Sequence, residues 1–228
     1  MTAITSFKSA ATEKRSHQSY FKIALSVDCV IFGYSEKELQ VLVIKSDLKE
    51  FAGLWSLLGD LVQPKEDIDE ASYRVLHERT GLKNVYLEQV HAFGECARHP
   101  SGRVVTIAYY SLIDINNYKL KYNERELTWQ PVRTLKKMAF DHRKIIDTCL
   151  RRLREQVFEK PLLFNLLPNK FALRDLQELY ESVLGEPLDR RNFRKKIAVK
   201  DWLRDTGELE QSVVHRPGRL YTKHFTNK

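Results

Sequence analysis

The sequence predicts an α+β protein in two parts: a mixed α/β/α sandwich, followed by a small module of two helices and a hairpin. Three observations carry this prediction. Runs rich in β-branched and aromatic residues alternate with few helical stretches up to residue 142. An amphipathic helix pattern follows at residues 143–160. Beyond it, two further helical patterns flank the breaker Gly185-Glu186-Pro187.

The first part begins with two strand patterns, at residues 23–32 and 39–44, which flank a turn-like segment and predict a hairpin. Residues 53–58 lead into a helix expected at about residues 69–80. Strands are then predicted at residues 85–93, 104–113 and 127–130, and a short helix at 131–137. This order gives four regions: a flexible arm (1–19), the sandwich domain (20–142), a connecting helix (143–160, ended by Pro161) and the C-terminal module (161–228).

The C-terminal module has the pattern of a winged helix. A helix at residues 171–184 is followed by Asp189, a good N-cap, and by a second helix at 190–198. One side of this helix carries Phe193 and Ile197, which we expect to be buried, and the other side carries cations. Two short strands are predicted at 202–203 and 220–222. Between them, Pro217-Gly218 predicts a type II turn flanked by arginines. The alternative is a basic face that is merely solvated. The candidate DNA contacts are Arg190, Arg191, Asn192, Arg194, Lys195, Arg216 and Arg219.

Charge supports a polyanionic partner for the second part. Residues 1–142 carry 19 Lys and Arg against 18 Asp and Glu, whereas residues 143–228 carry 19 against 12, so +7 of the net +8 lies in the tail. The three widely spaced cysteines predict reduced thiols rather than disulfides or a zinc site. With neither a secretion signal nor a membrane span expected, the predicted compartment is the cytoplasm, without membrane contact.

Residues 59–82 have the spacing of a catalytic motif. The spacing resembles the Nudix box, G-x5-E-x7-R-E-U-x-E-E-x-G-U, in which U is apolar. Asp60 stands at the first glycine of this pattern, and the matching residues are Glu66, Arg74, Leu76, Gly81 and Leu82. Residues three and four apart share a helix face, and carboxylates on that face would bind Mg²⁺.

Two substitutions in the box remove metal-binding glutamates. Val75 and Arg79 replace them, so Glu78 is the one left of that cluster. We therefore predict no catalytic residue, no metal and no cofactor, and hence no enzyme. Glu66 and Glu78 either hold a metal weakly or pair with Arg74 or Arg79.

Nearly the whole chain resembles the Nudix-related bacterial transcriptional regulators. The segments that carry this likeness are Leu54-Trp55-Ser56-Leu57, Phe140-Asp141-His142, Asn192-Phe193-Arg194-Lys195 and Arg216-Pro217-Gly218-Arg219. The resemblance implies a homodimer on a palindromic double-stranded DNA operator, controlled by a small-molecule effector bound to the Nudix-like domain.

Val75 and the run at residues 102–110 are closer to the pentose- and arabinose-responsive branch of Bacteroidetes, so a sugar is the expected effector. The alternatives are an ADP-ribose-responsive regulator of NAD metabolism, a weak Mg-dependent nucleoside diphosphate hydrolase, and a scaffold that binds no nucleic acid. The candidate effector contacts are Trp55, for stacking, and Asp60, Glu95, Arg98 and Arg103, for hydrogen bonds.

Overall fold

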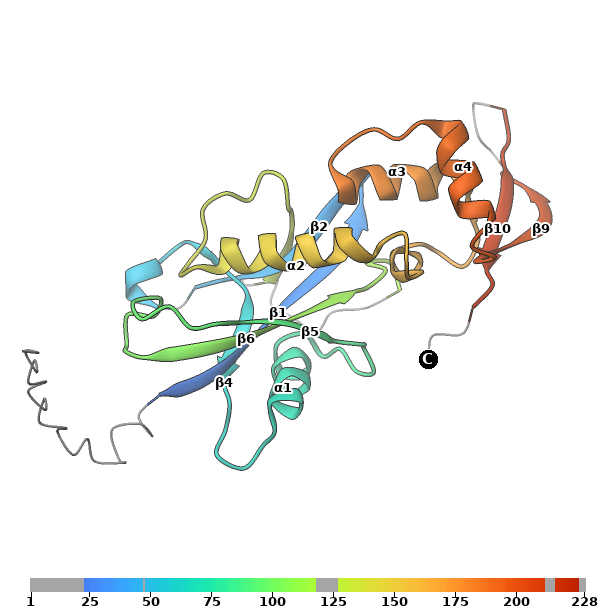
Figure 1. Ribbon diagram of the computed structural model, residues 1–228. Helices are drawn as coiled ribbons and strands as arrows, with labels where there is room; N and C mark the ends of the chain where they lie inside the picture. The colour runs from blue at the N-terminus through green and yellow to red at the C-terminus, as the bar shows by residue number, and fades with distance from the viewer. Residues whose placement is uncertain (1–22, 47, 118–126, 212–215, 226–228) are drawn as a thin grey trace, which may run out of the picture.

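The computed structural model describes residues 23–46, 48–117, 127–211 and 216–225, so the predicted arm at 1–19 lies outside the described residues. Its first part is a seven-stranded sheet with α1 (Ile68–Thr80) on one face and α2 (His142–Gln156) on the other (Figure 1). This arrangement confirms the predicted α/β/α sandwich. The strands are β1 (Ala24–Ser35), β2 (Glu38–Lys45), β3 (Trp55–Ser56), β4 (Leu58–Leu61), β5 (Glu88–Phe93), β6 (Val104–Leu112) and β7 (Leu127–Pro131).

β1 is the central strand of this sheet. It pairs antiparallel with β2 and β4 and parallel with β6, and β2 and β6 lead to β7 and β5. Its apolar residues are buried in both directions: Val27, Cys29 and Ile31 join the core under α1, whereas Val30 and Phe32 join the core under α2. A strand covered on both faces reads as a nearly continuous apolar run, which is why residues 23–32 were identifiable in the sequence.

α1 matches the helix predicted within the box. Ala71, Val75 and Leu76 are buried against the sheet. The carboxylate of Glu70 accepts the backbone N–H of Asp67 at 2.9 Å, and the helix ends at Gly81, whose φ of 74° is in the left-handed region that glycine tolerates.

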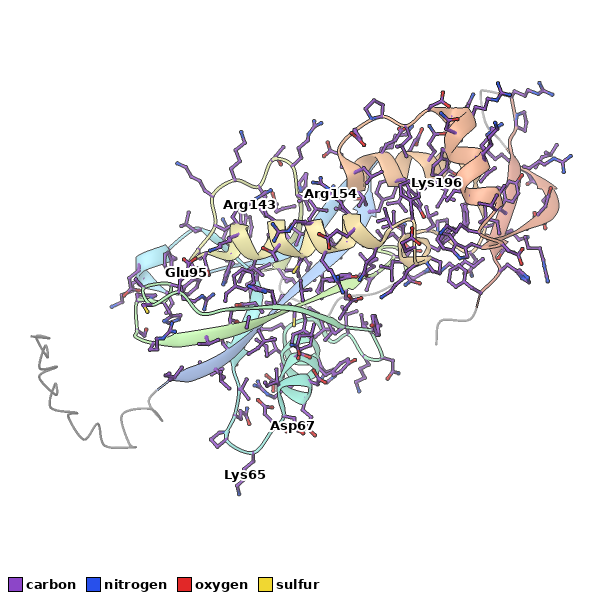
Figure 2. The ribbon with its side chains drawn as sticks, in the orientation of Figure 1. Lys65, Asp67, Glu95, Arg143, Arg154 and Lys196 are labelled. Carbon is purple, nitrogen blue, oxygen red and sulfur yellow. The ribbon has the colours of Figure 1, made fainter. Side chains whose placement is uncertain are left out.

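α2 is shorter than predicted, since it ends at Gln156 rather than at residue 160. The carbonyl of Val157 accepts the hydroxyl of Tyr180 on α3 (Leu173–Leu184) at 2.8 Å instead of a helical N–H. The apolar residues predicted to form one side of this helix are buried. The helix packs against the sheet and also contacts α3. Figure 2 shows Arg143 and Arg154 on α2, and Lys65 and Asp67 in the loop between β4 and α1.

The C-terminal module consists of two helices and a small sheet. α3 and α4 (Arg190–Ala198) match the predicted helices, and β8 (Phe171–Ala172), β10 (Arg219–Lys223) and β9 (Leu203–Leu209) form the sheet in that order. Its core is continuous with the core under α2, because residues such as Ile145, Phe164 and Leu176 belong to one buried cluster. The 3-10 helix η3 (Leu162–Leu166) joins the two parts.

Two local predictions were wrong. Residues 131–137 form a turn rather than a helix, because Arg143 takes the carbonyls of Val132 and Leu135 at 2.7 and 2.5 Å. Gly218 does not adopt the positive φ of a type II turn. Its N–H donates to the Glu210 carboxylate and its carbonyl accepts the Glu210 N–H, at 2.8 and 2.9 Å, so it continues the hairpin ladder.

Within the described ranges, no helix is both long and apolar enough to span a bilayer.

Candidate functional site

Arg74 on α1 gathers the acidic residues of the box segment. Its guanidinium donates to both carboxylate oxygens of Glu66, at 2.9 and 2.7 Å, and to the carbonyl of Leu61 at 2.9 Å. It also lies 3.2 Å from Glu78 and 3.6 Å from Asp60. The hydrogen bonds from Arg74 lower the pKa of Glu66 to about 2. Of the alternatives drawn from the sequence, the structure therefore shows pairing with Arg74.

The remaining box positions do not complete a metal site. The helix brings positions 75, 78 and 79 to one side of α1, where Val75 is buried in the core and Glu78 and Arg79 are exposed. Packing against the sheet turns Val75 inward. Among the described residues there is no group of three or more His, Cys, Asp and Glu that could hold a metal ion. With both glutamates bound to Arg74 and a guanidinium at position 79, this donor set does not fit Mg²⁺.

A cavity of about 230 Å³ opens beside the box, between β1, β4, the loop at 94–103 and the start of α2. Gly59 on β4 allows the close approach of the two strands, since a Cβ there would lie 2.2 Å from the Asp28 carboxylate and 2.9 Å from the carbonyl of Val27. The polar and aromatic residues that line the cavity include Ser26, Asp28, Ser46, Ser56, Asp60, Arg79, Arg98, His99, Phe140 and His142.

Asp28 and His142 form the buried polar floor of this cavity. Thr106 donates to the Asp28 carboxylate at 2.7 Å, and His142 Nε2 lies 3.5 Å from the other Asp28 oxygen. His142 Nδ1 accepts the backbone N–H of Leu57 at 2.9 Å, so the neutral ring carries its proton on Nε2, facing Asp28. Burial lowers the pKa of His142, which keeps the ring neutral at pH 7.

Phe140 forms the aromatic wall of the cavity in an unusual backbone conformation. Its φ is 51°, which is uncommon for a residue other than glycine. The ring stacks on His99, with centroids 5.0 Å apart and an interplanar angle of 22°, and contacts Phe51 at 4.4 Å and His142 at 4.9 Å. These contacts stabilise the backbone conformation of Phe140. They also place several aromatic rings beside a polar cavity, an arrangement suited to a ligand that contains a ring.

Two of the five predicted effector contacts, Asp60 and Arg98, line this cavity. The other three lie elsewhere. Trp55 packs under the ammonium of Lys45, 3.6 Å from the ring centre. Glu95 pairs with Lys144, and Arg103 donates to a backbone carbonyl of its own loop.

Sequence reasoning missed Asp28, His99, Phe140 and His142 as cavity residues. A carboxylate in an otherwise apolar strand was the available signal for Asp28. For His99 the sequence offered no comparable signal.

A second candidate surface is the exposed side of α4. Phe193 and Ile197 are buried, and the ring of Phe193 meets Tyr180 at 5.2 Å. Asp189 accepts the N–H of Asn192 at 2.8 Å, which confirms the predicted N-cap. The five predicted DNA contacts of this helix are all exposed: Arg190, Arg191, Asn192, Arg194 and Lys195.

A groove of about 570 Å³ runs between α4 and β10, and four predicted contacts line it: Arg190, Arg194, Arg216 and Arg219. Arg219 pairs with Asp205 on β9 at 2.7 Å. Arg174 at the start of α3 also lines the groove and pairs with Glu210 at 2.9 Å. Arg174 could not be identified from the sequence, because its place depends on how α3 packs against the hairpin. The groove therefore gathers cations from three separate elements.

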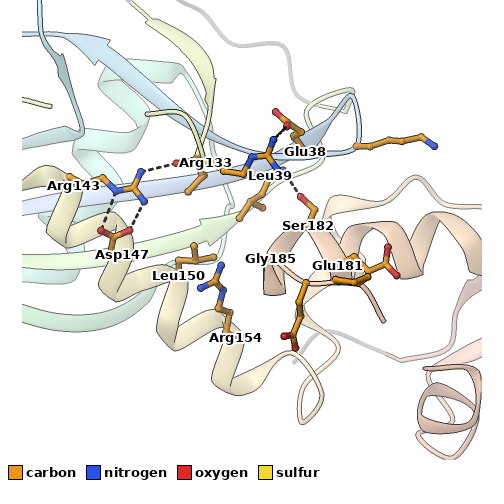
Figure 3. Close-up of a pocket in the computed structure, with 14 residues that line it drawn as sticks. Glu38, Leu39, Arg133, Arg143, Asp147, Leu150, Arg154, Glu181, Ser182 and Gly185 are labelled. Atoms are coloured by element: carbon orange, nitrogen blue, oxygen red, sulfur yellow. Dashed lines mark hydrogen bonds and ion pairs between the residues drawn. The ribbon is translucent and has the colours of Figure 1, made fainter. Parts of the chain in front are cut away.

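The two parts meet at a third cavity, of about 470 Å³, between the β1–β2 turn, α2 and α3 (Figure 3). The Leu39 N–H donates to the Ser182 hydroxyl at 2.7 Å, and Arg154 Nε donates to the carbonyl of Val183 at 2.7 Å. α2 thus reaches from the polar cavity at His142 to α3 at Arg154.

Comparison with known proteins agrees with this architecture. The family profile described as NUDIX domain matches residues 22–149, and the profile described as NrtR DNA-binding winged helix domain matches residues 163–222. The fold and its two surfaces thus define a regulator in which a Nudix domain precedes a winged helix. The chain belongs to the NrtR-like family of Nudix-related regulators.

Three relatives illustrate this membership. The "ADPR responsive transcriptional repressor NtrR" of Acinetobacter baylyi is 31% identical over 204 residues, which cover 86% of this chain and 80% of that protein. Shewanella oneidensis NrtR complexed with a 27mer DNA is 28% identical, with a TM-score of 0.73, over 88% of this chain and 93% of that one. The NUDIX domain of the same Shewanella protein, complexed with ADP ribose, is 27% identical, with a TM-score of 0.53, over 61% and 94%.

Proposed function

We propose that this protein is a cytoplasmic, homodimeric transcriptional regulator that binds operator DNA through α4 and the adjoining groove, and an ADP-ribose-type nucleotide through its Nudix domain. The observation that carries the proposal is that Arg74 forms ion pairs with Glu66 and Glu78 of the box, while a polar cavity lies directly beside it. Such a domain is equipped to hold a ligand without cleaving it.

The relatives favour ADP-ribose over the pentose that the sequence led us to expect. The Acinetobacter repressor is described as ADPR responsive, and the Shewanella NUDIX domain was crystallised with ADP ribose. The cavity supports the same choice, because it joins aromatic rings at Phe140 and His99 to the guanidinium group of Arg79. Rings accommodate a base or sugar face, and guanidinium groups accommodate phosphate.

DNA binding rests on the groove and on the exposed cations of α4. A recognition helix enters the major groove with its first residues at the base edges, where Arg reads guanine and Asn reads adenine. Arg191 and Asn192 occupy this part of α4, while Arg216 and Arg219 lie on the hairpin side. A dimer would place two such helices on the halves of a palindrome.

A gel-shift series tests the proposal. Promoter fragments of the source genome are incubated with the full chain at low salt, with and without ADP-ribose or arabinose. We expect a retarded fragment containing a palindrome, and a change in its retardation with ADP-ribose but not with arabinose. Arg191→Ala should weaken DNA binding. Lys65→Ala is the control and should not, because Lys65 lies in the loop between β4 and α1, outside the C-terminal module. If no fragment is retarded, the regulator proposal fails.

Hydrolysis is tested separately, because Nudix family membership leaves that activity open. The full chain is incubated with ADP-ribose and Mg²⁺, and release of AMP is measured. We expect no release of AMP above background, because the carboxylates of Glu66 and Glu78 both form ion pairs with Arg74. Turnover that Glu78→Gln abolishes would make the protein an enzyme.

A further inference from the structure

The metal site that the Nudix fold implies is replaced in this chain by an arrangement of opposite charge. Both oxygens of Glu66 accept hydrogen bonds from Arg74, and Glu78 shares the same guanidinium. Val75 is buried, and Arg79 places a permanent cation on the side of α1 where a carboxylate would contribute to metal binding. A ligand with a diphosphate group would therefore meet a guanidinium rather than an ion.

Arg79 is placed to meet such a ligand. It lies in the last turn of α1 and is exposed. It lines the cavity of about 230 Å³ and also an adjoining hollow of about 130 Å³. Gly59, Ser46 and Ser56 line both as well. Arg79 thus stands at the junction of the two spaces, beside hydroxyl groups that are able to donate hydrogen bonds to an anion.

The charge of Arg79 is not neutralised within the described part of the chain. Arg98, the other guanidinium of the cavity, is paired with Asp141 at 2.6 Å. Asp60 is turned toward Arg74, at 3.6 Å, and Asp28 accepts from Thr106. By contrast, no described residue forms an ion pair or a hydrogen bond with Arg79. It is therefore the unpaired cation of this cavity among the described residues.

We propose that Arg79 takes the place of the divalent cation, and that its guanidinium binds the diphosphate of the effector directly. The planar guanidinium presents two parallel N–H groups that match two phosphate oxygens, and its charge does not depend on pH in the physiological range. Effector binding is then independent of metal. This inference rests on the proposed function and specifies how its ligand is held.

A purely structural role for Arg79 makes a different prediction. A cation in the last turn of a helix interacts favourably with the helix dipole, and lysine serves this purpose as well as arginine. Phosphate binding distinguishes the two, because lysine offers a point charge instead of a two-pronged donor. Arg79→Lys therefore separates stability of α1 from recognition of the ligand.

Isothermal titration of the full chain with ADP-ribose, in EDTA and in Mg²⁺, tests the proposal. We expect equal affinity in the two buffers, a loss of roughly ten- to a hundredfold for Arg79→Ala, an intermediate loss for Arg79→Lys and a larger one for Arg79→Glu. Lys83→Ala, which removes another exposed cation three residues after the helix ends, is the control and should bind as the wild type does. Thermal unfolding of each variant verifies that the fold is retained.

Equal affinity of Arg79→Ala and wild type, or loss of wild-type binding in EDTA, would overturn the proposal. A titration with inorganic pyrophosphate keeps this result separate from the proposed function. If the wild type binds pyrophosphate more tightly than Arg79→Ala but does not bind ADP-ribose, the nucleotide assignment fails and the role of Arg79 stands. If it binds neither ligand, both fail.

Discussion

The guanidinium of Arg98 forms two hydrogen bonds with the carboxylate of Asp141, the residue directly before α2, at N–O distances of 3.0 and 2.6 Å. The two side chains are only 3% and 15% exposed, and Arg98 also lies 3.9 Å from Asp28. This pair ties the loop at 94–103 to the start of the helix. The wall of the polar cavity is therefore fixed by an ion pair that is largely shielded from water.

Removing one partner of this pair should be costly. Arg98→Met leaves two buried carboxylates without their cation, and we expect a loss of about 3 kcal/mol in the free energy of unfolding, measured by urea titration. The double variant Arg98→Met/Asp141→Asn should lose less than the sum of the single variants, because the second change removes one orphaned charge. Strict additivity would show that the two residues are not coupled.

Gly59 should tolerate no side chain. In Gly59→Ala the new Cβ would lie 2.2 Å from the Asp28 carboxylate, so β1 and β4 must separate or Asp28 must move. We expect a loss of about 1–3 kcal/mol in stability, together with weaker effector binding. Gly94→Ala is the matched control, because its Cβ meets neighbours no closer than 3.6 Å. Equal thermal stability of the two variants would contradict the prediction.

Ser182 accepts one of the hydrogen bonds that join the two parts. Ser182→Ala leaves the Leu39 N–H without its acceptor, and we expect a loss of about 1–2 kcal/mol in stability and faster hydrogen exchange at the Leu39 amide. Ser111→Ala is the matched control for the loss of a serine hydroxyl. The Ser111 hydroxyl is buried without a partner in the described structure, so its removal should leave stability unchanged or raise it.

The Glu66–Arg74 pair should give acid-dependent stability. The pKa of Glu66 falls from 4.5 to about 2 on folding, so its contribution is fully present above 4.5 and is lost as pH falls toward 2. The difference in unfolding free energy between wild type and Glu66→Gln should therefore be constant near pH 7 and shrink across this interval. Urea titrations between pH 2 and 7 measure this difference, and a constant difference for Glu66→Gln would refute the assignment.

Two cations of α4 should differ in their effect on DNA binding. Arg194 lines the groove, whereas the ammonium of Lys196 lies 3.4 Å from the ring centre of Phe158. Arg194→Ala should weaken DNA binding and lower the slope of log affinity against log salt by about 1. Lys196→Ala should leave this slope unchanged and lower stability slightly. The opposite pattern in fluorescence anisotropy titrations would refute this distinction.

Much of the fold could be predicted because its signals are local. β1 is a nearly continuous apolar run, α1 ends at a glycine, and Asp189 caps α4. The errors occurred where distant residues decide the backbone. Arg143 takes the carbonyls that a helix at 131–137 would need, and Glu210 holds Gly218 in the ladder.

The cavity was harder to predict for the same reason. Its floor joins Asp28 in β1 to His142 at the start of α2, which are 114 positions apart in the sequence. Of the three effector candidates in the loop at 94–103, Arg98 lines the cavity, whereas Glu95 and Arg103 are engaged with Lys144 and a backbone carbonyl. Spacing identifies which residues share a helix face, but not which loop closes over a pocket.

α2 begins at the polar cavity with His142 and holds α3 through Arg154 near its other end. Its 15 residues make a rod about 22 Å long, and tilting such a rod by about 5° at one end moves the other by about 2 Å. That displacement exceeds what the 2.7 Å bond between Arg154 and Val183 can absorb. If the cavity binds the effector as proposed, a ligand that tilted α2 would therefore carry α3 with it, because α2 connects the two places without a break.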